Sequence, residues 1–168
     1  ENADKIIKAN DIDIENGKNA GLTKSLLDRL KLSEERINGM ADGVSEVASL
    51  ADPVGRVLDG RTLKNGLQIE KVTVPMGVIG IIFEARPNVT SDAAALCLKA
   101  GSAVILRGGK EAINSNKAIA EIMRDAIESA GLPRDCVSLV EDTTRQSATE
   151  LMKLSDYLDV LIPRGGAG

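Results

Sequence analysis

Four short clusters of charged residues and glycines each follow a run of β-forming residues. They occupy residues 84–88, 107–111, 141–142 and 164–168. Glycine lets backbone amides approach a phosphate closely, and the amino end of a helix adds partial positive charge. Because ligands of open α/β sheets bind at the carboxyl ends of the strands, the four clusters are predicted to form one ligand-binding rim.

Aliphatic runs alternate with stretches of helical periodicity in the second half of the chain. Strands are predicted at residues 78–83, 103–107, 137–140 and 159–162, and helices at 91–100, 115–130 and 145–154. Gly131 and Pro133 indicate where the second of these helices ends. Right-handed crossovers between such strands produce a parallel sheet. The predicted fold class is α/β, with a Rossmann-like parallel sheet and flanking helices in residues 76–168.

The first half of the chain has a different pattern. Residues 4–58 carry apolar side chains at three- and four-residue spacing, with Ser33 as an expected N-cap, and Pro53 is expected to end a helical segment assigned to residues 1–53. In residues 54–75, Asn65 and Gly66 lie between β-capable flanks, which predicts a β-hairpin. One interpretation of this hairpin is a solvent-facing edge element.

Composition and charge exclude several classes of protein. The 168 residues are 43% hydrophobic and 1% aromatic, with a net charge of −4, so they offer neither the basic footprint nor the stacking residues of a nucleic-acid-binding protein. No apolar run approaches the ~18 residues of a membrane span, and no secretory signal pattern is present. A cytoplasmic location without membrane association is therefore expected.

The chain has no histidine and only two cysteines, Cys97 and Cys136. The two are far apart and lack metal-ligand spacing, so neither a metal site nor a histidine-dependent hydrolase is expected. Cys97 lies on the apolar face of a predicted helix, where a small buried thiol is ordinary core packing. Cys136, just before a predicted strand, is also interpreted as structural.

The glycines at the end of the chain are a weak signal by themselves, because any tight strand-to-helix turn can use glycine. Their spacing differs from the G-x-G-x-x-G fingerprint, and no such motif follows the first strand. The loop after the second strand presents Arg107 and Lys110 where NAD-binding folds often place an acidic residue for the ribose. Positive charge there favours a 2′-phosphate, and hence NADP(H).

Three motifs, EARPNVT at residues 84–90, LRGGKEA at 106–112 and IPRGGAG at 162–168, resemble those of the γ-glutamyl phosphate reductases of the aldehyde dehydrogenase superfamily. The resemblance covers nearly the whole chain. It implies NADPH-dependent reduction of L-glutamyl 5-phosphate to L-glutamate 5-semialdehyde in proline biosynthesis, and bifunctional pyrroline-carboxylate synthetases contain a similar module. It also suggests a homo-oligomer, with the hairpin as its joining surface, and glutamate 5-kinase as a partner.

The resemblance further implies which residues take part. The family's nucleophilic cysteine would lie beyond Gly168, so no catalytic residue is expected within the chain, which is interpreted as the amino-terminal, cofactor-binding fragment of a larger enzyme. A superfamily lysine at the position matched by Lys110 contacts the adenosine ribose; a solvated surface lysine is the alternative. The resemblance assigns this role to Lys110 alone; the other expected cofactor-binding residues come from the loops at the predicted strand ends. The full set is Glu84, Arg107, Gly108, Lys110, Arg164, Gly165, Gly166 and Gly168.

Arg86 and Asn88 are the candidate substrate-binding residues. Arginine can pair with the anionic oxygens of an acyl phosphate, and an asparagine amide can stabilise a thiohemiacetal oxyanion. A count from the GVIG motif at residues 77–80 places Arg86, not Asn88, opposite the superfamily's oxyanion asparagine, so both assignments stay open. Asn88 could instead be the N-cap of the following helix, in competition with Thr90 and Ser91.

Two other functions are compatible with the sequence. One is a non-catalytic α/β module that binds a nucleotide or a partner without turnover, which the absence of a nucleophile favours. The other is an aldehyde dehydrogenase-like enzyme for an unphosphorylated aldehyde, which the motifs at residues 84–90 and 162–168 make the weaker alternative.

Overall fold

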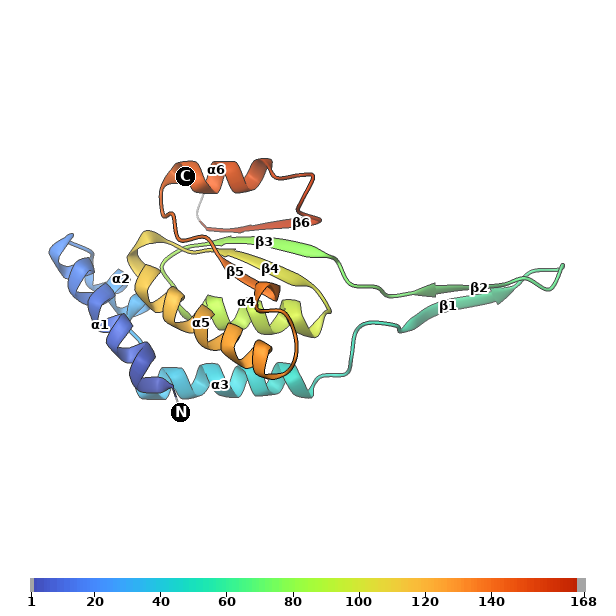
Figure 1. Ribbon diagram of the computed structural model, residues 1–168, viewed down its shortest axis with the longest axis horizontal. Helices are drawn as coiled ribbons and strands as arrows, with labels where there is room; N and C mark the ends of the chain where they lie inside the picture. Colours follow the sequence, from blue (N-terminus) through green and yellow to red (C-terminus); the bar gives the residue numbers. More distant parts are fainter. Residues whose placement is uncertain (1, 166–168) are drawn as a thin grey trace.

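The computed structural model describes residues 2–165 and has a parallel four-stranded sheet at its centre (Figure 1). The strand order is β5-β4-β3-β6, with β3 (Val78–Phe83), β4 (Ala103–Arg107), β5 (Val137–Leu139) and β6 (Val160–Arg164). Helices α4 (Asn88–Lys99) and α5 (Ile113–Ser129) cover one face, and α6 (Arg145–Lys153) lies over the other. Two 3-10 turns, η1 (Lys110–Ala112) and η2 (Arg134–Cys136), precede α5 and β5. The predicted α/β fold class is confirmed.

The core forms where alternate residues of the strands meet α4 and α5. Ile79, Ile81 and Phe83 of β3 are all buried, as are Val104 and Leu106 of β4. Period-two alternation places them on one face of the sheet, where each buried side chain stabilises the fold by roughly 1.5–3 kcal/mol.

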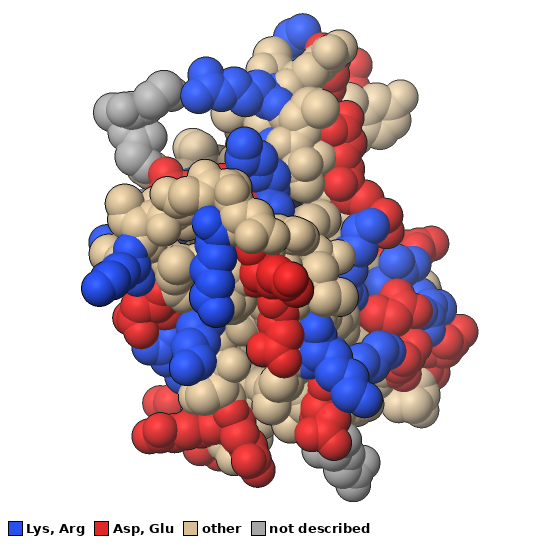
Figure 2. Space-filling view, turned by 90° about the vertical axis from the view of Figure 1, so that its left-hand side faces the viewer, with Lys and Arg blue, Asp and Glu red and all other residues tan. Residues whose placement is uncertain are grey.

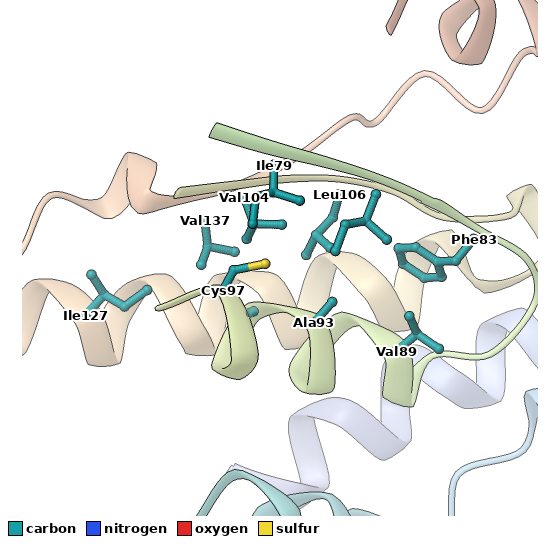
Figure 3. Close-up of a cluster of buried hydrophobic side chains, with 11 residues drawn as sticks. Ile79, Phe83, Val89, Ala93, Cys97, Val104, Leu106, Ile127 and Val137 are labelled. Carbon is teal, nitrogen blue, oxygen red and sulfur yellow. The ribbon is translucent and has the colours of Figure 1, made fainter. Parts of the chain in front are cut away.

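Cys97 projects from α4 into this same cluster (Figure 3). Burial raises the pKa of its thiol above the ordinary value, so the protonated form is favoured. The interpretation of Cys97 as a core residue is confirmed. Cys136 is half-buried and packs against the edge of the cluster.

Three amino-terminal helices form an outer layer against α4 and α5: α1 (Ala3–Asn19), α2 (Lys24–Leu30) and α3 (Glu34–Ser49). A second apolar cluster joins them to α5 through Ile119. Ser33 caps α3, since its Oγ accepts a hydrogen bond from the Arg36 amide at 3.3 Å, as predicted. The helical pattern expected to reach residue 58 stops at Ser49, where Leu50 adopts an extended conformation, and Val57 pairs with Val72 in a strand.

The predicted hairpin is confirmed and extends well away from the rest of the molecule (Figure 1). Its strands, β1 (Val57–Thr62) and β2 (Gln68–Val72), pair antiparallel in a separate two-stranded sheet, and all their residues are exposed. Gly66 has a φ of +88°, which explains why the turn requires glycine.

Two element boundaries that bear on the site differ from expectation. Helix α4 begins at Asn88, and neither Asn88, Thr90 nor Ser91 caps it: Pro87 is the N-cap, without a side-chain hydrogen bond to the helix. The proline ring fixes a φ compatible with helix initiation, so the helix starts earlier than the polar residues suggested. Strand β6 continues to Arg164, which pairs with Phe83 instead of lying in a loop.

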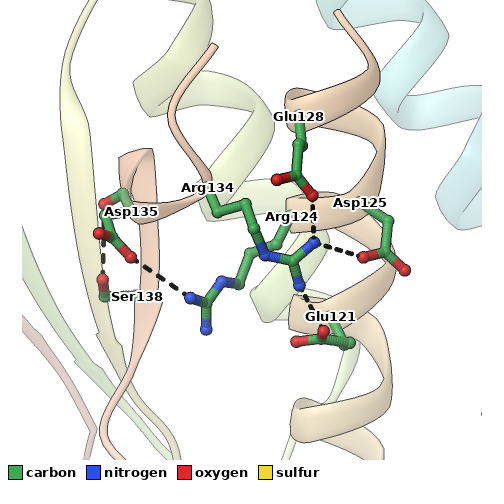
Figure 4. Close-up of polar contacts among 7 residues, drawn as sticks. All are labelled: Glu121, Arg124, Asp125, Glu128, Arg134, Asp135 and Ser138. Carbon is green, nitrogen blue, oxygen red and sulfur yellow. Dashed lines mark hydrogen bonds and ion pairs between the residues drawn. The ribbon is translucent and has the colours of Figure 1, made fainter. Parts of the chain in front are cut away.

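The far end of α5 is held by Arg134 (Figure 4). Its guanidinium pairs with Glu121, Asp125 and Glu128, which follow one another along one side of the helix. The hydrogen bond from Arg134 lowers the pKa of the Asp125 carboxyl below its ordinary value.

Candidate cofactor-binding site

The sequence predicted one rim formed by four loops, and the loops after three neighbouring strands, β3, β4 and β6, lie close together at one end of the molecule. The loop after β4 contacts the loop after β3, since a Cβ added at Gly109 would lie 3.2 Å from the Ala85 amide nitrogen. A Cβ added to Gly165, after β6, would lie 2.9 Å from Glu84 Oε1. Figure 2 looks onto this end, where basic and acidic side chains are interspersed. The face that Figure 2 shows therefore has individual basic side chains among acidic ones, without a continuous basic surface.

Packing already explains why residue 108 is glycine. A Cβ at Gly108 would lie 2.2 Å from Asn116 Nδ2 and 3.1 Å from the Phe83 ring, and both side chains are buried. Asn116 Oδ1 accepts a hydrogen bond from Thr90 Oγ1 at 3.0 Å, which holds the amide in place. Gly108 thus lets β4 turn closely over the first turn of α5.

Arg107 connects the end of β4 to the loop before α6. Its Nη2 donates to the carbonyl oxygens of Thr143 and Thr144, both at 2.8 Å. In that loop, hydrogen bonds from the amide and hydroxyl of Thr144 lower the pKa of Asp142, with a smaller contribution from the charge of Arg107. The structure therefore gives Arg107 a loop-anchoring role that sequence reasoning did not foresee.

The Lys110 side chain differs from that of Arg107, since it makes no hydrogen bond or ion pair to the described residues. Lys110 begins η1 and is exposed. Arg164 is likewise exposed at the end of β6, beside Glu84 and Gly165. Both side chains therefore carry exposed positive charge at the rim. Gly166 and Gly168, also expected here, lie outside the described residues.

A shallow hollow adjoins the rim on the α6 side of the sheet. It combines apolar side chains with the Ser147 hydroxyl, which donates to the Asp142 carbonyl at 2.6 Å. Its lining residues are Val140, Asp142, Gln146, Ser147, Glu150, Leu151 and Leu154.

Arg86 and Asn88 lie in a separate groove, between the outer helical layer and α4. Asn88 Nδ2 donates to Asp92 Oδ2 at 2.9 Å, whereas Arg86 is exposed and its side chain has no hydrogen bond or ion pair to the described residues. The groove is lined by Asp28, Arg29, Lys31, Leu32, Arg36, Gly39, Met40, Arg86, Asn88 and Asp92. Sequence reasoning missed the basic side chains from α2 and its carboxyl end, because no local motif distinguishes them from a solvated helix face.

Arg36 is the one of these basic groups that the structure holds rigidly. Its guanidinium donates to the carbonyl oxygens of Asp28 and Lys31 and pairs with the Asp28 carboxylate at 3.1 Å. Arg29 and Lys31 are exposed. The groove thus has four basic side chains and two acidic ones.

No group of acidic residues and cysteines in residues 2–165 is arranged to hold a metal ion. Within the same residues, no helix is both long enough and apolar enough to cross a membrane.

Comparisons with known proteins agree on one group of enzymes. The γ-glutamyl phosphate reductase of Halothermothrix orenii is 60% identical over 165 residues, which are 98% of this chain and 40% of that protein. Crystal structures of γ-glutamyl phosphate reductases from Thermotoga maritima and Saccharomyces cerevisiae match with TM-scores of 0.97 and 0.89, at 44% and 40% identity. They are matched over 99% and 98% of this chain, and over 40% and 42% of theirs.

The chain therefore spans about 40% of the length of the curated relatives that it matches. The model of the aldehyde dehydrogenase family matches residues 18–160, which include α2, α3, the hairpin and strands β3 to β5 of the parallel sheet. The chain belongs to the aldehyde dehydrogenase family.

Proposed function

We propose that this chain is the cofactor-binding part of an NADPH-dependent reductase that converts L-glutamyl 5-phosphate to L-glutamate 5-semialdehyde in proline biosynthesis in the cytoplasm. The observation that carries the proposal is similarity over the whole chain to proteins named γ-glutamyl phosphate reductase, at up to 60% identity. The nucleophilic cysteine that such a reaction needs would come from residues beyond Gly168.

Family membership implies a nicotinamide cofactor, and the residues at the rim fit one. Loops that approach one another this closely can hold an extended ligand across β4, β3 and β6. When bound, the cofactor would supply the hydride. Lys110 would bind a cofactor phosphate or ribose, and Arg164 would add positive charge. Glu84 and Gly165, which lie close together, would line the site between Lys110 and Arg164.

The 2′-phosphate of NADPH distinguishes it from NADH, and Lys110 is the residue proposed to recognise it. Arg107 would act less directly, since its guanidinium holds the β5–α6 loop through two carbonyl oxygens while its charge still favours an anion. The hollow beside α6 would take the apolar surface of the adenine ring, because Leu151 and Leu154 contribute to its lining.

The substrate would enter by the groove that contains Arg86. L-Glutamyl 5-phosphate carries several negative charges, and Arg29, Lys31 and Arg86 give the groove exposed positive charge. We assign Arg86 to the acyl phosphate. The Asn88 amide already binds Asp92, so we assign to Asn88 the lesser task of shaping the groove beside it.

The hairpin is proposed to join subunits. Its apolar side chains Val57, Leu58, Leu67, Ile69 and Val72 are all exposed, which a second copy of the chain would bury. Sedimentation analysis of the complete gene product and of its Ile69→Glu variant would test this. An unchanged sedimentation coefficient would leave the hairpin as a solvent-facing element.

Fluorescence titration with NADPH and NADH tests the cofactor assignment. The complete gene product should bind NADPH more tightly than NADH, and Lys110→Glu should remove most of that preference. Lys8→Glu reverses an exposed charge on α1, away from the rim and the hollow, and serves as the matched control, with little change expected. Folded protein that binds neither nucleotide would refute the proposal and favour a non-catalytic module.

A further inference from the structure

A buried carboxylate joins the outer helical layer to the cofactor rim. Asp13 lies in α1 and is 1% exposed, yet it takes part in none of the ion pairs of residues 2–165. Its partners are instead at the first turn of α5, about a hundred positions later in the sequence. Oδ1 accepts from the Asn114 amide at 3.2 Å and from Asn114 Nδ2 at 2.7 Å. Oδ2 accepts from the Ser115 amide at 2.7 Å and from Ser115 Oγ at 2.6 Å.

These bonds supply the cap that α5 lacks locally. Ala112 is the N-cap residue of α5 and offers no side-chain acceptor, so the free amides of the first turn need partners from elsewhere. The carboxylate also lies at the positive end of a helix of 17 residues. Four donors and the helix dipole together stabilise a charge that burial would otherwise disfavour.

Asn10, one turn earlier in α1, extends the same network. Its Nδ2 donates to Ser115 Oγ at 3.0 Å and to the Leu30 carbonyl at 2.8 Å, while its Oδ1 accepts from the Leu32 amide at 2.8 Å. Ser115 Oγ therefore accepts from Asn10 and donates to Asp13. Both carboxylate oxygens of Asp13 and both polar atoms of the Asn10 side chain are paired, which fixes the position of α5 relative to α1.

The first turn of α5, which these bonds hold in place, also contacts the loop at the rim. Lys110 and Gly108 immediately precede α5, and Asn116, next to Ser115, packs against Gly108. Asn116 also binds Thr90 of α4 at 3.0 Å. A displacement of the first turn of α5 would therefore move Lys110 and Gly108 together.

We propose that Asp13 is a positioning residue for cofactor binding, which sets the place of the Gly108–Lys110 loop by capping α5 from another helix. The inference rests on the proposed NADPH site. It assigns to the outer helical layer a part in cofactor affinity.

The test is Asp13→Asn in the complete gene product. The amide group would place donor hydrogens against the donors of residue 115, and the first turn of α5 would shift. We expect the Kd for NADPH to rise about tenfold, as for the loss of one charge-assisted hydrogen bond. Hydrogen exchange at the amides of Asn114 and Ser115 should become faster, whether or not cofactor is present.

Two control variants distinguish a positioning role of Asp13 from the effects of a lost charge and of lower stability. Asp11→Asn removes the same charge from the exposed face of α1. Gly131→Ala strains the opposite end of α5, where φ is +82° and no atom lies near the added Cβ. Both variants should keep the Kd within about twofold of the wild-type value. If Asp13→Asn does not fold, Ser115→Ala should change both readouts in the same direction but by less.

Each outcome has a distinct meaning. Wild-type protein that does not bind NADPH overturns the proposed function, and with it this inference. If the wild type binds but Asp13→Asn leaves the Kd unchanged while exchange at Ser115 becomes faster, only the inference is overturned, and the network is structural. An equal rise of the Kd in Gly131→Ala would also overturn it, because general destabilisation would then explain the effect.

Discussion

Gly108→Ala should destabilise the fold by collision with a side chain that cannot move away. The new Cβ would lie 2.2 Å from Asn116 Nδ2 and 3.1 Å from the Phe83 ring. Asn116 is fully buried, and its bond to Thr90 opposes any rotation of the amide. Overpacking of this kind costs about 1–3 kcal/mol. We expect a loss near 2 kcal/mol in the free energy of unfolding, or roughly a thirtyfold change in the folding equilibrium.

A double-mutant cycle identifies the collision partner. Asn116→Ala alone should cost about 1 kcal/mol for the lost hydrogen bond. In the double variant, the smaller side chain at position 116 leaves room for the Cβ at position 108. The two losses should therefore fall short of additivity by about 1–2 kcal/mol. Urea unfolding followed by far-ultraviolet circular dichroism gives all four free energies. A Gly108→Ala loss below about 0.5 kcal/mol, or strictly additive losses, would refute the packing explanation.

Two further substitutions test features remote from the rim. Gly43→Ala adds a methyl group in open space within α3 and should stabilise the fold by about 0.5–1 kcal/mol. The melting temperature should then rise by roughly 2 °C. A lower melting temperature would contradict the open space around Gly43. Because Arg134 lowers the pKa of Asp125, that carboxylate stabilises the fold above its unfolded pKa near ~4, and the contribution is lost as pH falls through the lowered folded pKa. Arg134→Gln should therefore lower the melting temperature at pH 7 more than at pH 3, and an equal decrease at both would argue against the ion pairs.

Features with a local sequence signal were predicted well. Buried alternation in β3 and the turn at Gly66 depend on neighbouring residues, so the sequence contains the information directly. The same is true of the Ser33 cap, where acceptor and amide are three residues apart. The predicted start of α4 was wrong. The proline before the helix fixes a helical φ, so the helix begins without a side-chain cap.

Features that join distant segments could not be predicted. Arg107 was expected to face a phosphate, but strand alternation places it on the α6 side, where two carbonyl oxygens are within reach. The basic residues of the groove beside Arg86 and the bonds of Asp13 depend on how helices pack, which the periodicity of the sequence does not determine. The ligand contacts proposed for Lys110 remain predictions, which the titrations above test.

A local exposed cation would let a chain with a net charge of −4 attract the proposed anionic cofactor. Near the rim, Lys117 pairs with Glu141 at 2.6 Å and Arg107 is bound to carbonyl oxygens, so these cations are already occupied by the protein. Lys110, by contrast, is exposed and without such a partner in residues 2–165. Because exposed charges interact over about a Debye length of 8–10 Å, their local arrangement determines the attraction more than the distant acidic helices do. NADPH affinity should therefore decrease steeply with added salt in the wild type and much less in Lys110→Glu.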